Sequence, residues 1–101
     1  MQASAQVQGD KAVLKLVGRF DFNTHREFRA AYEPVMEKPG VTQVVVDLSG
    51  VEYLDSSALG MLLMLRDKAT AAKRAITLSG VQGSVKQVLD IANFGKLFRI
   101  E

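Results

Sequence analysis

An aspartate and two serines stand together at Asp55-Ser56-Ser57, where a stretch of apolar residues with helical spacing begins. Such residues favour a helix N-cap, because their side-chain oxygens accept free backbone N–H groups of the first turn. A serine hydroxyl at a helix start can also accept a phosphoryl group, which adds about −1.5 to −2 charge and three acceptor oxygens. On residue types alone the cap is the favoured interpretation of Ser56, and Ser57 competes with it for any phosphate.

Ser56 lacks the partners that a catalytic serine needs. The one histidine, His25, falls at the start of the first predicted helix and is expected to be a polar surface residue near a cap. No Gly-x-Ser-x-Gly turn surrounds Ser56, and the chain has no cysteine. The isolated carboxylates form no cluster of metal ligands, and no Gly-x-x-x-x-Gly-Lys loop is present to hold a nucleotide. The sequence therefore predicts a binding protein without enzymatic activity, cofactor or metal.

The helix predicted after Asp55 runs to about Ala72 and carries apolar side chains on two sides. Projection at 100° per residue gives a core stripe of Ala58, Leu62, Leu65, Ala69 and Ala72. The opposite side forms a second strip, here called the docking strip, of Ser56, Gly60, Leu63, Met64 and Asp67. Two interpretations are open. Either Leu63 and Met64 pack under another element, or the strip docks a partner, with Gly60 allowing close backbone approach. In the second case Leu63→Asp leaves the fold intact and abolishes binding.

The elements are expected in the order β-β-α-β-α-β-α, followed by a short end strand. They are a hairpin of strands 5–8 and 12–17 around Gly9-Asp10, a helix after Asn23-Thr24, a strand at 43–48, the helix after Asp55, a strand at 75–79, a helix at 84–92 and a short end strand at 98–100. The first helix carries Phe28, Ala31, Tyr32 and Val35 on one face. Pro34 is expected to kink or shorten this helix, and Pro39-Gly40 to end it.

The run Gln43–Leu48 is β-branched without alternation, a pattern typical of a central strand that helices cover on both faces. Helical crossovers are expected to join the later strands in parallel, whereas the hairpin is antiparallel. The predicted fold class is therefore α/β, a sandwich with a mixed central sheet of four to five strands and helices packed against it. A loop at 49–54 would bring Asp55 to the carboxyl edge of the sheet, where open α/β folds bind their ligands.

Length and composition limit the remaining possibilities. The 101 residues, 48% of them hydrophobic, predict one domain over 1–101 with a single core. The net charge is +2, the basic residues are scattered singly and there is no Trp, so binding to nucleic acid is not expected. The longest apolar stretch, Leu59–Leu65, is too short to cross a membrane, and no secretion signal is apparent. Together with the missing cysteines, these features predict a cytoplasmic protein with no membrane or nucleic-acid partner.

The segment Asp55-Ser-Ser-Ala-Leu-Gly60, with Val44–Leu54 before it, resembles the signature of STAS domains, specifically of bacterial anti-sigma factor antagonists. Leu16–Asp21 resembles the family's early strand, glycine and acidic residue, and Val85–Ile100 resembles its final helix and tail. The resemblance covers the whole chain and implies a STAS-like sandwich. Ala58 departs from it, because the family's Asp-Ser-Ser-Gly-Leu-Gly has its first glycine there; alanine, a better helix former, makes the helix start stiffer.

The resemblance implies a protein that binds an anti-sigma factor and thereby frees a sigma factor. In this family the anti-sigma factor is itself a serine kinase with a GHKL-type ATP fold. It phosphorylates the serine directly after the motif aspartate, which corresponds to Ser56, and a PP2C-type phosphatase reverses the reaction. The implied partner surface adds Asp21, Asp55 and Ser57 to the docking strip. The alternative is a STAS scaffold or transporter-associated module that binds its partner constitutively, independent of Ser56.

Overall fold

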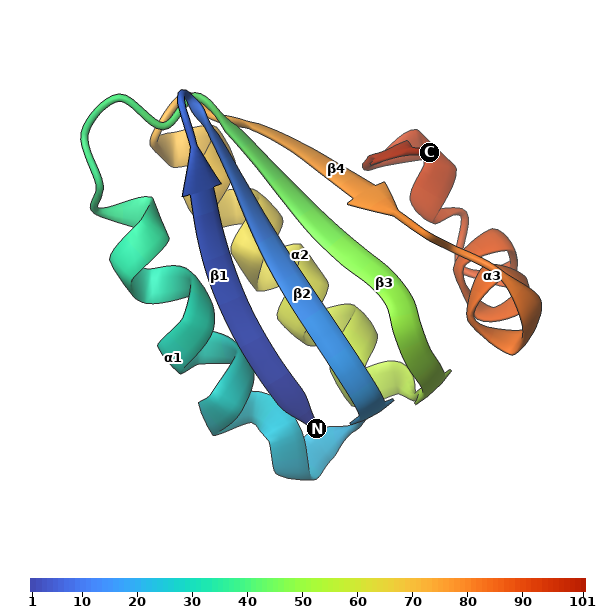
Figure 1. Cartoon of the computed structure of the whole chain (residues 1–101). Helices are drawn as coiled ribbons and strands as arrows, with labels where there is room; N and C mark the ends of the chain where they lie inside the picture. The colour runs from blue at the N-terminus through green and yellow to red at the C-terminus, as the bar shows by residue number, and fades with distance from the viewer.

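The computed structural model describes residues 1–101 and has one mixed sheet with the strand order β1-β2-β3-β4-β5 (Figure 1). β1 (Gln2–Gln8) is antiparallel to β2 (Lys11–Phe20), and β3 (Gln43–Leu54), β4 (Ala75–Ser79) and β5 (Arg99–Ile100) follow in parallel. The helices are α1 (His25–Met36), α2 (Ser56–Ala71) and α3 (Gly83–Ile91), with 3₁₀ turns η1 (Phe22–Thr24) and η2 (Phe94–Lys96). The predicted α/β class, the hairpin and the short last strand are confirmed.

Helices α1 and α2 cover one face of the sheet, and the opposite face of β1, β2 and β3 is open (Figure 1). Buried side chains alternate along β2 and β3; they are Ala12, Leu14, Leu16, Val44, Val46 and Leu48. The prediction that Gln43–Leu48 is covered on both faces is therefore wrong. Val45 on the open face is half-buried and pairs with Val13 of β2, so its β-branched side chain packs across strands and not against a second helix layer.

Strand β3 is longer than predicted and takes in the segment expected to be a loop. Gly50 and Val51 pair with Val17 and Gly18 of β2, and Leu54 pairs with Phe20. The register of this ladder shifts twice, between Lys15 and Val17 and between Gly18 and Arg19. At the first shift a Cβ on Gly50 would lie 3.0 Å from the Leu16 carbonyl oxygen, so the glycine permits the close approach of the two strands.

The first helix begins after Asn23-Thr24 and ends before Pro39-Gly40, as expected, but the side chain that caps its start is a different one. A 3₁₀ turn, η1, precedes it, and Asp21 caps that turn in place of Asn23 or Thr24. Pro34 lies inside α1, which continues to Met36 and ends before Pro39. The predicted core face is confirmed, since Phe28, Tyr32 and Val35 are buried and Ala31 packs against the core in a half-buried position.

Helix α3 lies beside the second half of β3. β4 pairs only with Gln43–Asp47, and α3 contacts β3 beyond that stretch, where the Ser84 hydroxyl donates to the Glu52 carbonyl at 3.4 Å. After α3 the rings of Phe94 and Phe98 stack on each other, and the chain then enters β5 at the edge of the sheet. No helix here has both the length and the apolar character needed to cross a membrane.

Candidate functional site

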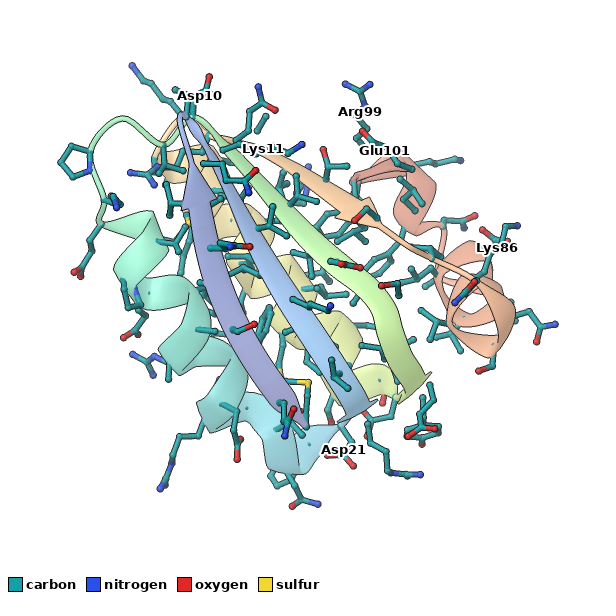
Figure 2. All side chains as sticks on the ribbon, viewed as in Figure 1. Asp10, Lys11, Asp21, Lys86, Arg99 and Glu101 are labelled. Carbon is teal, nitrogen blue, oxygen red and sulfur yellow. The ribbon has the colours of Figure 1, made fainter.

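Four of the predicted site residues, Asp21, Asp55, Ser56 and Ser57, gather at the carboxyl ends of β2 and β3, and the others follow along α2. The backbone N–H of Asp55 donates to the carbonyl of Phe20 at 3.3 Å, which places the turn that carries Asp21 next to the start of α2. Figure 2 shows Asp21 at the end of the sheet opposite the one that carries Asp10 and Lys11. The structure therefore brings Asp21, Asp55 and Ser56 to one edge, as the resemblance implied.

Asp55, and not Ser56, caps helix α2. Asp55 has an extended backbone (φ −113°, ψ −176°), and its carboxylate accepts the N–H of Ala58 at 3.0 Å. Ser56 is the first helical residue and is exposed, and its hydroxyl makes no hydrogen bond within the chain. Ser57 is half-buried. Because the aspartate provides the cap, the Ser56 hydroxyl is free and reachable from solvent.

Replacing each residue by alanine distinguishes these roles. Asp55→Ala is expected to lower the free energy of unfolding by about 1 kcal/mol, because the Ala58 N–H loses its acceptor. Ser56→Ala is the matched control and is expected to change it by less than about 0.5 kcal/mol, as for an ordinary surface substitution. Urea unfolding of the two variants measures both values, and a larger loss for Ser56→Ala would assign the cap to the serine.

Asp21 has a structural role beside its place in the site. One of its carboxylate oxygens accepts the N–H of Asn23 at 3.0 Å, and its own N–H donates to the Thr24 hydroxyl at 3.1 Å, which completes a capping box. The other oxygen lies 3.7 Å from Nε of Arg19. Asp21 therefore holds the turn in place and keeps a negative charge near the start of α2.

Three residues at this edge were missed by the sequence analysis. Phe22 is 75% exposed, and the Arg19 guanidinium lies 4.2 Å from the ring centroid of Tyr53, itself 41% exposed. Arg19 and Tyr53 are directly paired across β2 and β3. The pairing could not be inferred while 49–54 was expected to be a loop; the signal available was the set of β-branched, aromatic and aliphatic residues Val51, Tyr53 and Leu54 within that segment.

The docking strip is exposed over most of its length. Ser56, Gly60 and Asp67 are exposed, Met64 is 49% exposed, and no atom lies within 4 Å of the position that a Gly60 Cβ would take. Leu63 differs, because it is half-buried and packs against the core. A charge at Leu63 would therefore disturb folding as well as docking, and Met64 is the better position at which to test the strip.

The core stripe of α2 is confirmed at four positions and fails at the fifth. Ala58, Leu62, Leu65 and Ala69 are buried, whereas Ala72 is exposed. Ala72 follows the last helical residue, so the periodicity no longer applies to it. Met61, which the projection had placed outside the stripe, is buried beside it.

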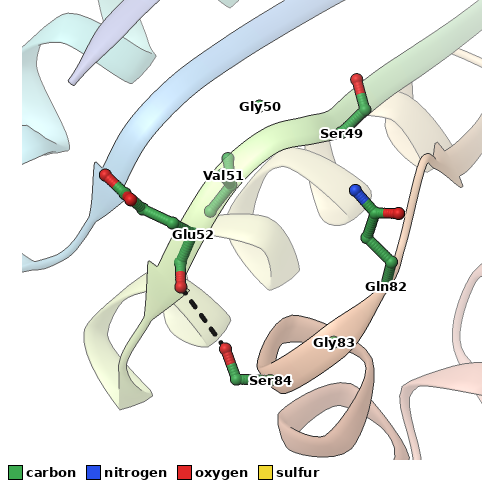
Figure 3. Close-up of a pocket in the computed structure, with 7 residues that line it drawn as sticks. All are labelled: Ser49, Gly50, Val51, Glu52, Gln82, Gly83 and Ser84. Carbon is green, nitrogen blue, oxygen red and sulfur yellow. Dashed lines mark hydrogen bonds between the residues drawn. The ribbon is translucent and has the colours of Figure 1, made fainter.

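The surface hollows of the chain lie elsewhere. Ser56 lines none of the five hollows, and the one in Figure 3, about 440 Å³, lies between β3 and α3. Its lining residues are Ser49, Gly50, Val51, Glu52, Gln82, Gly83 and Ser84. No group of three or more His, Cys, Asp or Glu side chains is placed to hold a metal ion. An exposed strip without a cavity favours contact with a macromolecule over binding of a small molecule.

An ion pair marks the surface of α1 away from this edge. A hydrogen bond from Arg29 to Glu33 lowers the pKa of the Glu33 carboxyl and raises the pKa of the guanidinium. Burial raises the pKa of the neighbouring Tyr32 hydroxyl. The pair lies at i, i+4 spacing and joins successive turns of the helix.

Residues 3–99 match the family model described as "Mlab, STAS domain". The chain belongs to the STAS domain family. A STAS-domain containing protein of Pseudomonas aeruginosa (strain UCBPP-PA14) is 45% identical over 98 residues, 97% of this chain and 95% of that protein. An anti-sigma F factor antagonist of Lysinibacillus sphaericus is 28% identical over 74 residues, 72% of this chain and 63% of that protein.

Solved structures confirm the STAS fold. The unphosphorylated anti-sigma factor antagonist SpoIIAA has a TM-score of 0.74 at 19% identity, covering 98% of this chain and 86% of that one. A putative antagonist from Thermotoga maritima has a TM-score of 0.85 at 18% identity, covering 97% and 84%. The murine anion transporter Slc26a9 also contains the fold, with a TM-score of 0.79 at 15% identity over 98% of this chain and 20% of that one. The STAS fold thus occurs both in anti-sigma factor antagonists and in a transporter.

Proposed function

We propose that this STAS domain is an anti-sigma factor antagonist whose binding is switched by phosphorylation of Ser56. The observation that carries the proposal is the exposed Ser56 hydroxyl, which begins α2 and is released from capping by Asp55. The match to a protein named anti-sigma F factor antagonist supports the same function. In this proposal the chain acts in the cytoplasm, as a binding module and not as an enzyme.

The partners follow from the family resemblance of the Asp55–Gly60 segment. The unphosphorylated chain binds an anti-sigma factor that is also a serine kinase of the GHKL type, and a sigma factor is freed. The kinase transfers the γ-phosphoryl group of ATP to the Ser56 oxygen, whose proton is released, with ADP as the other product. A PP2C-type phosphatase hydrolyses the phosphoserine and restores the binding form.

The charges around Ser56 explain why a phosphate would prevent binding. The partner would cover the docking strip together with Asp21, Asp55 and Ser57. A phosphate on Ser56 would place about −1.5 to −2 charge beside the carboxylates of Asp55 and Asp21. The start of α2 attracts the phosphate by only about 0.3–1 kcal/mol while it is exposed. Burying it against a partner without matched cations costs several kcal/mol, so the interface penalty is the larger effect.

A constitutive STAS module is the second candidate. It is favoured by the presence of the fold in an anion transporter. Such a module would bind its partner equally well with any residue at position 56. The two candidates therefore differ in one measurable property, the dependence of binding on the charge at Ser56.

Affinity capture from the native cytoplasm tests the proposal. Wild type, Ser56→Ala, Ser56→Asp and Met64→Asp would be used in parallel as bait. We expect wild type and Ser56→Ala to retain a histidine-kinase-like ATPase, and Ser56→Asp and Met64→Asp to lose it. Capture of the same proteins by wild type, Ser56→Ala and Ser56→Asp would contradict the switch and favour the constitutive module, and capture by Met64→Asp would contradict the docking strip.

A further inference from the structure

The outer edge of β1 carries backbone groups that have no partner within the chain. β1 pairs only with β2, through the Gly9-Asp10 turn closed by Gln8 and Lys11. In a two-residue hairpin the closing pair exchanges both hydrogen bonds, and bonded pairs recur at every second residue. The N–H and C=O groups of Ala3, Ala5 and Val7 therefore point away from β2, and no loop or side-chain hydrogen bond reaches any residue of β1.

This edge lacks the features that normally prevent strand pairing. Gln2–Gln8 contains no charged residue, proline or glycine, and its seven pairs with β2 run without a bulge. The opposite edge of the sheet is different. β5 has two residues, one of them Arg99, and Glu101 follows directly. Only the β1 edge is long, regular and uncharged, and so suited to accept another strand.

A hollow of about 550 Å³ lies beside the β1 edge, between this strand and α1. Small side chains line most of it, among them Ala3, Ala5, Ala30, Ala31 and Pro34. Figure 1 shows α1 running alongside β1, and both elements start at the same end of the sheet. The lining side chains other than Met1, Gln2 and Glu27 are small, so most of the hollow leaves room for a strand added to β1.

We propose that two copies of this chain pair through β1 as an antiparallel two-fold ribbon centred on Ala5, which joins their sheets into one. In this register Ala5 faces Ala5 of the second copy and Ala3 faces Val7, so the outward N–H and C=O groups of both strands pair. On the open face Gln2 lies opposite Gln8 and Ser4 opposite Gln6. All of these pairs are neutral, so no like charges oppose each other.

The register argues for a second copy over a different protein. A two-fold interface requires a self-complementary surface, and the alternation of small apolar and neutral polar residues in Gln2–Gln8 meets that need. Glu27 lies in the first turn of α1 and lines the hollow. Because α1 and β1 start at the same end of the sheet (Figure 1), the two-fold places the two Glu27 residues toward opposite ends of the ribbon. This pairing of two copies goes beyond the proposed function. The docking strip lies on α2 and not on β1, so the pairing can be measured on the purified chain without the anti-sigma partner.

Sedimentation velocity of the full chain at rising concentration tests the pairing. We expect a monomer–dimer equilibrium for wild type and a monomer for Ala5→Pro, whose missing N–H points outward and leaves the β1–β2 ladder intact. Ala5→Lys provides a second edge variant. Gln43→Lys, an exposed position on β3, is the control with the same charge and should still dimerise. Thermal unfolding confirms that all variants fold.

Disulfide crosslinking tests the register, because the chain has no cysteine of its own. In Ala5→Cys the two Cα atoms would lie about 5.5 Å apart, within reach of a disulfide. In Gln8→Cys they would lie about 20 Å apart and should not crosslink. Wild type that stays monomeric at about 1 mM, dimers that persist in Ala5→Pro, or equal crosslinking of both cysteine variants would overturn the proposal.

Discussion

Ser56→Asp is expected to weaken binding of the anti-sigma partner by about 10-fold or more, whereas Ser56→Ala retains it. The aspartate places a fixed negative charge where α2 begins, next to Asp55 and near Asp21. The partner would then have to bury this charge together with the two carboxylates already present. Titration of the captured partner with each variant measures the effect.

The control for this prediction is Gln82→Asp. Gln82 stands at the N-cap of α3 and makes no side-chain cap hydrogen bond, so the variant adds the same charge at the start of a different helix. It is expected to leave partner binding unchanged and to raise the free energy of unfolding by about 0.5–1 kcal/mol through a new cap. If Gln82→Asp weakened binding as much as Ser56→Asp, net charge and not the Ser56 position would control the interaction.

Gly80→Ala is expected to lower the free energy of unfolding by about 2–5 kcal/mol. Gly80 has φ +68°, where an L-residue is disfavoured by about 1–2 kcal/mol. An added Cβ would also lie 2.7 Å from the backbone nitrogen of Ser49, and overpacking of this kind costs about 1–3 kcal/mol. Ser49 cannot easily move, because its N–H and hydroxyl both donate to Asp47, at 2.9 and 2.7 Å.

Gly83→Ala isolates the steric part of this cost. Gly83 has nearly the same backbone conformation, with φ +59°, but no atom lies within 4 Å of its would-be Cβ. Its variant should lose only about 1–2 kcal/mol, the conformational cost alone. Thermal or urea unfolding of the two variants provides the comparison, and equal losses would mean that the contact with Ser49 is unimportant.

Local patterns were sufficient to predict most of the elements that position the site. The start of α2 after Asp55, the buried face of α1 and the parallel strands at 43–48 and 75–79 each follow from caps and periodicity within one segment. Exposure of Ser56, Gly60 and Asp67 agrees with the helical projection. Helix starts, buried faces and exposed positions of this kind depend on residues close together in the chain, so they can be predicted from a single sequence.

The errors arose where a distant segment decides the structure. Residues 49–54 contain Ser49, Gly50 and Glu52 and resemble a turn locally, but the second half of β2 provides a pairing partner. The coverage of β3 depended on where α3 would pack, which no local pattern shows. For Leu63 the helical position left packing and docking both open, and its packing against the core decides between them. Tertiary contacts override local preference in each case.

The most direct test of the Ser56 switch is the affinity of the anti-sigma partner for the chain before and after stoichiometric phosphorylation, with mass spectrometry to locate the phosphate. We expect the phosphate on Ser56, binding weakened by about 10-fold or more, and full recovery after treatment with a PP2C-type phosphatase. Equal affinity for the two forms, or a phosphate found on Ser57 with Ser56 unmodified, would contradict the account.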